Sequence, residues 1–480
     1  MNENNELDYC QTNFGDKSKN EKLTKRQCEN LLANSSDFKF IVKFPDEKSF
    51  NPSVEMYNNS VIIKPAKKIS GSVRIPPDKS ISHRAAMLAS AASGTSVIEN
   101  FLLSADCKST LSAVASFGAK VKKKGSTITV TGAPFSTPAK PVDCGNSGTT
   151  VRLLAGFAAG QGAGAVFTGD GSLSKRPMKR VMEPLKLMGA SVTCKNGRLP
   201  MRLKKAELHG INYTMPVPSA QVKSALLLAA LGATGEIKIN EKIISRDHTE
   251  RILKLFGVRI SAAAGKIRMK CGQTLKACKI KVPGDISSAA FFICAAAILK
   301  SRLKILDVGV NPTRAGFLRA LGKMGLKYRL SNKRFLGKEP VADILVMKSS
   351  LRGAVFSAKD MPSMIDEVPL LALCATQAEG KTIISGAGEL AVKECDRIEA
   401  TYSELRKMGA DITKRPDGFI IRGPVKLKGA AVSGFADHRI IMMLALAALA
   451  ADGKSVIDDT KGVEISFPGF FKELGRHIKT

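Results

Sequence analysis

Cationic and hydroxyl side chains come together in a segment that the sequence predicts to be the start of a helix. Lys79 and Ser80 follow Asp78, and Arg84 lies one helical turn after Ser80, on roughly the same face. An ammonium group, a hydroxyl and a guanidinium in this arrangement suit an anionic ligand. The alternative is an ordinary capped helix whose lysine and arginine point into solvent.

Further segments of the first half place glycine, arginine or hydroxyl residues where helices are expected to begin. Gly148, in the sequence Gly-Asn-Ser-Gly-Thr, would let a ligand approach the backbone closely. Arg176 precedes a proline, which suits the first turn of a helix. Each feature is weak by itself, because such side chains could simply be solvated and a lone histidine is more often structural than catalytic. The remaining candidate residues before the second lobe are Ser219, Ala220, Gln221, Arg246 and His248.

The second half of the chain supplies carboxylates as well as cations. Asp366 and Glu367 stand at the mouth of an apolar helix, where a base or acid could work, although acids also cap helices at this position. Lys393 and Arg397 lie one turn apart and flank Glu394, and a surface network at i,i+4 spacing is the alternative interpretation there. A last polar opening completes the set: Asp437, His438 and Arg439.

These polar segments recur with the same pair of helices. An Ala- and Leu-rich helix that is apolar nearly all round follows each opening, so we expect it to be buried. A β-rich stretch and a second helix come next, and the second helix ends at a glycine of the kind that forms left-handed caps. The six glycines are Gly118, Gly189, Gly257, Gly325, Gly409 and Gly475.

Six copies of this unit predict an α/β protein with two lobes of three repeats each. An open solenoid is the alternative, but copies of about 70 residues with two unlike helices are long for a solenoid repeat. If each lobe packs its three buried helices in parallel, three helix N-termini emerge on one face, each with about half a positive charge and free N–H donors. Two such faces opposed would form a cleft suited to phosphates and carboxylates.

Composition narrows the choice of partner. The net charge is +32, with lysine and arginine spread from residue 61 to the end, and aromatic residues make up only 5% of the chain. A nucleic-acid-binding repeat protein predicts basic stripes and clustered aromatic side chains instead. We therefore expect small anionic substrates as partners, and no nucleic acid.

The cysteines and the apolar runs indicate a location. None of the ten cysteines forms a CxxC pair or has a histidine at metal-ligand spacing, which predicts a reducing, cytoplasmic compartment and no metal. The longest apolar run, Ile440–Ala451, is too short to span a bilayer, which needs about 20 residues. Residues 1–60 are polar and lack an apolar signal segment, so we expect a disordered or loosely attached extension.

The order and joint presence of the polar segments resemble the EPSP synthase family, in the bacterial subgroup with the SAQ-K-S-A and RDHTER forms. The resemblance covers roughly residues 65–472 with no long gap and rests on nine motifs: PPDKSISHRAAML, GNSGTTVRLLAG, GDGSLSKRPM, PSAQVKSALLLAAL, SRDHTER, VPGDISSAAFF, MIDEVPLLAL, VKECDRI and DHRIIMM. It implies an inside-out α/β prism in two lobes, which agrees with the six copies. It also implies residues 78–282 in one lobe and residues 61–77 with 283–480 in the other, in a chain that is expected to be a monomer.

The resemblance further implies an activity, the transfer of the enolpyruvyl group of phosphoenolpyruvate to the 5-hydroxyl of shikimate 3-phosphate, with release of phosphate and without a cofactor. It implies Asp366 as catalytic acid/base, with proton transfer at the methylene by either Glu394 or Lys79. The shikimate 3-phosphate site implied by the family comprises Lys79, Ser80, Arg84, Ser219, Ala220, Gln221, Arg246, Asp366 and Lys393. The phosphoenolpyruvate site comprises Lys79, Gly148, Arg176, Gln221, Arg397 and Arg439.

One position departs from the family pattern. Some members have a lysine before the C-terminal Thr-Phe-Pro or Ser-Phe-Pro, whereas Ile465 stands there in this chain. Phosphoenolpyruvate is then expected to rely on the remaining cations. The nearest rival family, the enolpyruvyl transferases that act on a UDP-sugar, typically carries a loop cysteine as proton donor, and no cysteine of this chain sits in a comparable Arg/Pro-Gly loop.

Overall fold

The computed structural model describes residues 10–14, 17–21, 54–56 and 59–479. Most of the N-terminal extension expected over residues 1–60 therefore lies outside the described residues. Within its described part, β1 (Cys10–Phe14) pairs with β2 (Lys17–Glu21), and β3 (Val54–Met56) pairs antiparallel with β4 (Val61–Ile63). Val54 is buried against the core, so the folded body includes a strand that precedes the repeat pattern.

Among the described residues, six helices are buried along nearly their whole length, because their sequences are apolar nearly all round. Side chains of the predicted polar openings cap five of them, at Asp78, Ser147, Ser219, Asp285 and Asp437. The six helices are α2 (Lys79–Ser90), α4 (Gly148–Gly160), α7 (Ala220–Ala229), α9 (Ile286–Ile298), α11 (Val368–Thr376) and α13 (His438–Ala450).

A second helix of each repeat has one exposed face: α3 (Ala105–Ser116), α6 (Lys179–Leu187), α8 (His248–Leu255), α10 (Gly316–Lys323), α12 (Arg397–Lys407) and α14 (Phe470–His477). The predicted glycine caps follow the first five of these helices, all at positive φ. The prediction is wrong for Gly475, which lies inside α14. The chain leaves α14 directly into β28 (Ile478–Lys479), which pairs with β5 (Lys68–Ile69), so no left-handed turn is needed there.

Within residues 54–56 and 59–479, six four-stranded sheets share one pattern, a parallel pair followed by two antiparallel pairings. The first three sheets are β18 (Lys279–Lys281)-β7 (Thr95–Glu99)-β9 (Thr127–Thr131)-β8 (Lys120–Lys124), β10 (Val142–Asp143)-β11 (Ala165–Thr168)-β13 (Arg198–Lys204)-β12 (Ser191–Lys195), and β14 (Asn212–Thr214)-β15 (Glu236–Asn240)-β17 (Lys266–Lys270)-β16 (Ile260–Ala263).

The other three sheets are β6 (Ser72–Arg74)-β19 (Leu303–Gly309)-β21 (Glu339–Val346)-β20 (Tyr328–Leu336), β22 (Val355–Phe356)-β23 (Gly380–Ile384)-β25 (Gly418–Gly423)-β24 (Asp411–Arg415), and β26 (Ala431–Val432)-β27 (Ser455–Ile457)-β4-β3. Shorter helical pieces lie between these helices and strands: α5 (Gly171–Lys175), η1 (Ala230–Gly232), η2 (Met361–Ser363), η3 (Ile365–Glu367), η4 (Gly388–Val392) and η5 (Thr460–Ile465).

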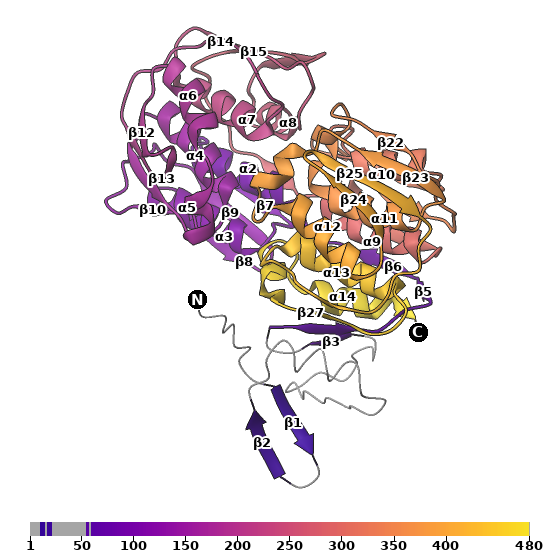
Figure 1. Ribbon diagram of the computed structural model, residues 1–480. Coiled ribbons are helices and arrows are strands. Elements are labelled where there is room, and N and C mark those ends of the chain that lie inside the picture. Colours follow the sequence, from indigo (N-terminus) through magenta and orange to yellow (C-terminus); the bar gives the residue numbers. More distant parts are fainter. Residues whose placement is uncertain (1–9, 15–16, 22–53, 57–58, 480) are drawn as a thin grey trace.

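The described chain builds two hydrophobic cores. One contains buried residues between Ile81 and Val282, and the other contains buried residues of 54–75 and 286–478. Figure 1 shows two bodies side by side, with α2, α4 and α7 in one and α9, α11 and α13 in the other, and with strands on their outer faces. This is the inside-out α/β arrangement that the resemblance implies, and it agrees with the six repeats.

Two neighbouring stretches of chain connect the bodies. The backbone N–H of Asp78 donates to Pro283 O (2.8 Å), and that of Asp285 donates to Pro76 O (2.9 Å). The starts of α2 and α9 are therefore held beside each other, although they belong to different cores.

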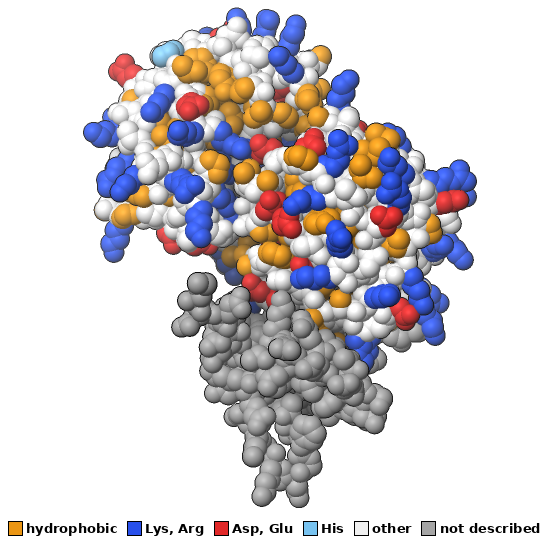
Figure 2. Space-filling model, in the orientation of Figure 1, with side chains coloured by type: hydrophobic (Ala, Val, Ile, Leu, Met, Phe, Trp, Pro, Cys, Tyr) orange, Lys and Arg blue, Asp and Glu red, His pale blue; other side chains and the backbone are white. Residues whose placement is uncertain are grey.

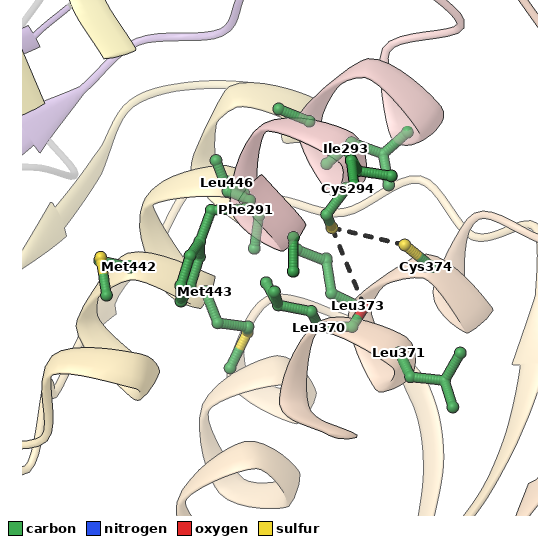
Figure 3. Packing of buried hydrophobic residues seen from close by; sticks show 14 of the residues in the cluster. Phe291, Ile293, Cys294, Leu370, Leu371, Leu373, Cys374, Met442, Met443 and Leu446 are labelled. Carbon is green, nitrogen blue, oxygen red and sulfur yellow. Dashed lines mark hydrogen bonds between the residues drawn. The ribbon is translucent and has the colours of Figure 1, made fainter. Parts of the chain in front are cut away.

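Close packing of three helices makes the second core. Phe291 and Cys294 of α9, Leu370 and Cys374 of α11, and side chains of α13 interdigitate there (Figure 3). The two thiols touch at an Sγ–Sγ distance of 3.4 Å, and burial raises the pKa of Cys294 well above its usual value. Both cysteines act as small hydrophobic residues, as their Ala-rich surroundings in the sequence predict.

Candidate active site

The polar openings of the buried helices meet between the two bodies. Four hydrogen bonds or ion pairs link one helix start to another: Lys79 N to Asp285 Oδ2 (3.2 Å), Gln221 Nε2 to Thr149 Oγ1 (3.2 Å), Ser287 Oγ to Glu367 Oε1, and Arg439 Nη1 to Glu367 Oε1 (3.3 Å). A fifth contact, Arg246 to Asp366, joins the two bodies. The helix N-termini, which favour anions, are thus joined to one another by polar side chains.

Asp366 is the centre of a cluster of cations. Arg246 Nη2 pairs with its Oδ2, while Lys393 Nζ and Arg397 Nη1 lie 3.4 Å and 3.5 Å from its Oδ1. Arg439 Nη1 donates to the backbone carbonyl of the same residue (3.1 Å). Cations from both bodies therefore converge on one carboxylate.

The environment of Asp366 favours a charged carboxylate. Burial opposes its ionisation, but Lys393, Arg246, Arg439 and Arg397 outweigh burial and hold the pKa of Asp366 well below its usual value. Neither Asp366 nor Glu367 caps α11 with its side chain, because this helix begins without a side-chain cap hydrogen bond. The alternative interpretation, simple helix capping, is therefore wrong.

A second carboxylate, Glu394, lies beside the first. Its Oε1 is 3.3 Å from Arg176 Nη1 of the other body, and its Oε2 accepts from Arg397 Nη2 (2.6 Å). Arg397 is in turn fixed by Asp437, which accepts from Nε at 2.8 Å. Burial opposes ionisation of Glu394 too, yet Arg397 and Arg176 keep its pKa well below the usual value.

Lys79 has a carboxylate partner that sequence reasoning missed. Its Nζ lies 3.1 Å from Oδ2 of Asp106, near the start of α3. Burial lowers the pKa of Lys79, but Asp106 and, less strongly, Glu394 outweigh burial and raise it above the usual value. Lys79 is therefore an ammonium ion at neutral pH.

Arg84 differs from the other predicted cations of the site. It is only 4% exposed, and its guanidinium donates to three uncharged oxygens: Thr249 Oγ1 (2.7 Å), Ser224 Oγ (2.8 Å) and Ser80 O (3.0 Å). In the part of the chain that the structure describes, it has no carboxylate within ion-pair distance. Burial lowers its pKa to about 10, so a buried positive charge faces the site without a paired anion.

Comparison with known proteins decides the family. The family model of EPSP synthase (3-phosphoshikimate 1-carboxyvinyltransferase) matches residues 63–474. The 3-phosphoshikimate 1-carboxyvinyltransferase of Syntrophomonas wolfei is 48% identical over 415 residues, which cover 85% of this chain and 97% of that protein. The enzyme of that name from Endomicrobium trichonymphae is 48% identical over 422 residues, covering 86% and 98%.

The chain belongs to the EPSP synthase family.

Solved structures agree with this assignment. The chain is similar to the EPSP synthase of Acinetobacter baumannii, with a TM-score of 0.79 and 40% sequence identity over 88% of this chain and 99% of that one. The expected fold class, the two-lobed inside-out α/β prism, is thereby confirmed.

Four further residues of the predicted site lie at helix starts. Ser219 caps α7, Ala220 is its first residue, and Gln221 Oε1 accepts from Arg152 Nη1 (2.8 Å). Gly148 is the first residue of α4, and a Cβ added there would lie only 3.0 Å from a guanidinium nitrogen of Arg152. The absence of a side chain at residue 148 keeps this opening clear.

The position that departs from the family pattern lies beside the site. Ile465 is half-buried at the end of η5, and η5 packs against α13 and against α3, the helix that carries Asp106.

Sequence reasoning missed one cation, Arg152. It has no carboxylate partner among the described residues, and burial lowers its pKa to about 10. Its position four residues after Gly148 was the available signal.

The described residues offer little for other ligand classes. Across 10–14, 17–21, 54–56 and 59–479, no group of three or more His, Cys, Asp and Glu side chains could hold a metal ion. No helix in those ranges has the length and hydropathy to cross a bilayer. Figure 2 shows lysine and arginine side chains scattered over both bodies on the face drawn, rather than gathered into one stripe.

Proposed function

We propose that the protein transfers the enolpyruvyl group of phosphoenolpyruvate to the 5-hydroxyl of shikimate 3-phosphate and releases inorganic phosphate. The observation that carries the proposal is the meeting of cations from both bodies around Asp366, in a member of the EPSP synthase family. A base surrounded by cations suits a reaction between two multiply charged anions.

Each anion has a set of candidate contacts. The phosphate of shikimate 3-phosphate would be bound by Arg84, whose charge has no adjacent carboxylate, and by the helix start at Ser219, with Arg246 as the second cation. Lys393 and Asp366 would hold the ring hydroxyls. The carboxylate and phosphate of phosphoenolpyruvate would be bound by the remaining residues of the proposed site: Lys79, Gly148, Arg176, Gln221, Arg397 and Arg439.

The proposed reaction proceeds by addition and elimination. The 5-hydroxyl oxygen attacks C2 of phosphoenolpyruvate while Asp366 takes the hydroxyl proton, and the C3 methylene receives a proton, which gives a tetrahedral ketal. C3 then loses a proton as the C–O bond to phosphate breaks, so the enol ether and inorganic phosphate form. No electrons are exchanged with any other group.

Two residues could carry the proton for C3. Lys79 holds its proton in the substrate-free protein because Asp106 raises its pKa. Glu394 is ionised there, and it would take up a proton only when the anionic groups of phosphoenolpyruvate offset Arg176 and Arg397. Both residues remain candidates in the proposal.

The proposal also covers the division of the chain into lobes, its oligomeric state and its location. Residues 78–282 would form one lobe and residues 61–77 with 283–480 the other, closing over the substrates and excluding water. Because one chain supplies both sides of the cleft, the enzyme would act as a monomer, and we propose the cytoplasm as its location.

A phosphate-release assay with both substrates tests the activity. We expect phosphate only when phosphoenolpyruvate and shikimate 3-phosphate are both present, and a product whose NMR spectrum shows a vinyl ether. A UDP-sugar offered in place of shikimate 3-phosphate is the control for the rival transferases. No release with shikimate 3-phosphate would contradict the proposal.

Asp366→Asn tests the proposed base. Turnover should fall by roughly a hundredfold to ten-thousandfold, because the variant keeps the shape of the side chain and loses the general base. Asp396→Asn is the matched control, since Asp396 accepts from Ile398 N and Glu399 N as a true helix cap and asparagine caps equally well. Near-normal turnover of Asp366→Asn would move the assignment to Glu394.

A further inference from the structure

Two charged residues of the sequence motifs have no part in the proposed transfer: Lys223 in the SAQ-K-S-A motif and Glu250 in RDHTER. Their side chains meet, with Lys223 Nζ 2.8 Å from Glu250 Oε1 and 2.9 Å from Glu241 Oε2. All three side chains are at most 3% exposed. Buried ion pairs seldom stabilise a protein more than apolar residues of the same volume would. A role in positioning is therefore worth seeking.

The ammonium group of Lys223 joins three separate elements. Its three donors are matched by Glu241, which follows β15, by Glu250 on α8, and by the backbone carbonyl of Ser245 at 3.3 Å. Glu241 Oε1 also accepts from the N–H of Ser245 (3.2 Å) and from its hydroxyl. The loop of residues 241–247 is thus held from within by one buried network.

The network adjoins both cations proposed for the phosphate, Arg246 in the loop and Arg84 on α2. Arg246 follows Ser245 directly, and its guanidinium points to Asp366 across the cleft. Ser224 and Thr249, adjacent in sequence to Lys223 and Glu250, are the hydroxyl partners of Arg84 and bond to each other at 2.6 Å. The same network therefore lies behind Arg84 and behind Arg246.

We propose that Lys223, Glu241 and Glu250 form a positioning triad that sets the placement of Arg84 and Arg246, and so makes the acceptor site selective for a phosphorylated ligand. This inference rests on the proposed function. Burial lowers the pKa of Arg84, and Glu250 of the triad is the charged group that most offsets this effect. A placement enforced by a rigid supporting network is what tight anion recognition requires.

Two variants of the triad test the inference. Lys223→Met removes the central cation but leaves two buried acids, which can impair folding. The triple variant Lys223→Met/Glu241→Gln/Glu250→Gln keeps the shapes, removes all three charges and so avoids that penalty. Lys254→Met is the matched control, because it makes the same change at an exposed position on α8.

The kinetic constants separate positioning from general damage. In the triple variant we expect the KM for shikimate 3-phosphate to rise tenfold or more, while the KM for phosphoenolpyruvate stays within twofold. With unphosphorylated shikimate as acceptor, the triple variant and the parent should have equal kcat/KM, because no phosphate is present to sense the cations. Equal increases in both KM values, or an unchanged KM for shikimate 3-phosphate, would overturn the proposal.

A measurement that needs no activity complements the kinetics. Amide hydrogen exchange over residues 241–247 should be faster in both triad variants than in the parent and in Lys254→Met, while the rest of α7 and α8 stays protected. Unchanged exchange in this loop would refute the positioning role even if the protein had another substrate. Absence of phosphate release from the parent enzyme would instead refute the proposed function.

Discussion

At the level of single residues, burial and neighbouring charges have opposite effects on the pKa of Lys79. Lys79 is the first residue of a buried helix, and burial there favours the neutral amine over the ammonium ion. Asp106, 3.1 Å away, reverses that preference. Oδ1 of Asp106 is itself buried without a hydrogen-bond partner among the described residues, so this carboxylate is committed to Lys79 through its other oxygen.

Asp106→Asn should shift the pH dependence of the enzyme. Without the carboxylate, burial and Arg439 dominate, so the pKa of Lys79 falls. Because Lys79 must be charged to bind an anion, the alkaline limb of kcat/KM for phosphoenolpyruvate should move to lower pH. The profile of kcat/KM reports the free enzyme and is the quantity to measure.

Asp143→Asn provides the matched control for this experiment. Asp143 is exposed in the same lobe and accepts from Gly145 N (2.9 Å), a contact that an asparagine oxygen can keep. Its profile should coincide with that of the parent. An alkaline limb of Asp106→Asn that stayed in place, or moved to higher pH, would show that Asp106 does not govern the charge of Lys79.

At the level of elements, the distance between α4 and α7 decides where their N-termini lie. Gly156 and Gly160 of α4 face the backbone of α7, and a Cβ added at Gly156 would come within 2.2 Å of Ala225 O. The two helices can approach this closely only because one of them lacks side chains along the contact. Their starts carry Gly148 and Gln221, so this contact also sets the width of the proposed phosphoenolpyruvate site.

Gly156→Ala should therefore destabilise the protein, despite the higher helix propensity of alanine. Overpacking of this kind costs about 1–3 kcal/mol, and a clash with backbone atoms belongs at the upper end of that range. Gly171→Ala is the control, because a Cβ there meets nothing within 4 Å and the position is exposed. Urea unfolding measures both; equal stability of the two variants would mean that α4 and α7 adjust freely.

The elements are also where sequence reasoning succeeded. Helix starts such as Asp78 and Asp437 could be predicted because an N-cap and the apolar run after it are close in sequence. Glycine caps were predictable for the same reason. The prediction for Gly475 was wrong because the conformation of the chain after α14 depends on pairing with Lys68–Ile69, a strand about 400 positions earlier in the sequence.

The candidate site was only partly predictable. The charges of Lys79 and Arg84 at a predicted helix start marked them as candidate binding residues. The sequence did not indicate which residues contact them. Thr249 contacts Arg84 from 165 positions away, and no local pattern marks that contact. The Lys223–Glu241–Glu250 triad could not be predicted from the sequence. The lysine and the two acids belong to separate elements, and only the fold shows that they are buried in contact.

At the level of the whole molecule, ion pairs between the two bodies hold them together in the substrate-free protein. Arg246 pairs with Asp366, Arg176 with Glu394, and Arg180 makes two hydrogen bonds to Glu389 at 3.1 Å and 3.2 Å. The Arg180 pair is partly exposed and is therefore subject to screening by salt. Substrate anions would compete with Asp366 for Arg246 and with Glu394 for Arg176. Each substrate carries more negative charge than the single carboxylate it replaces, so it would attract the cations of both bodies more strongly.

Adding both substrates should therefore shift the protein towards a more compact state, because two multiply charged anions would bind cations of both bodies at once. Small-angle scattering of the parent protein at reaction equilibrium can measure this change, because the Arg246–Asp366 pair is then intact in the substrate-free reference. The radius of gyration should fall with phosphoenolpyruvate and shikimate 3-phosphate, and high salt should raise it in the substrate-free protein alone. Inorganic phosphate at the same ionic strength is the control. Identical profiles with and without both substrates would contradict a cleft that closes by movement of two lobes.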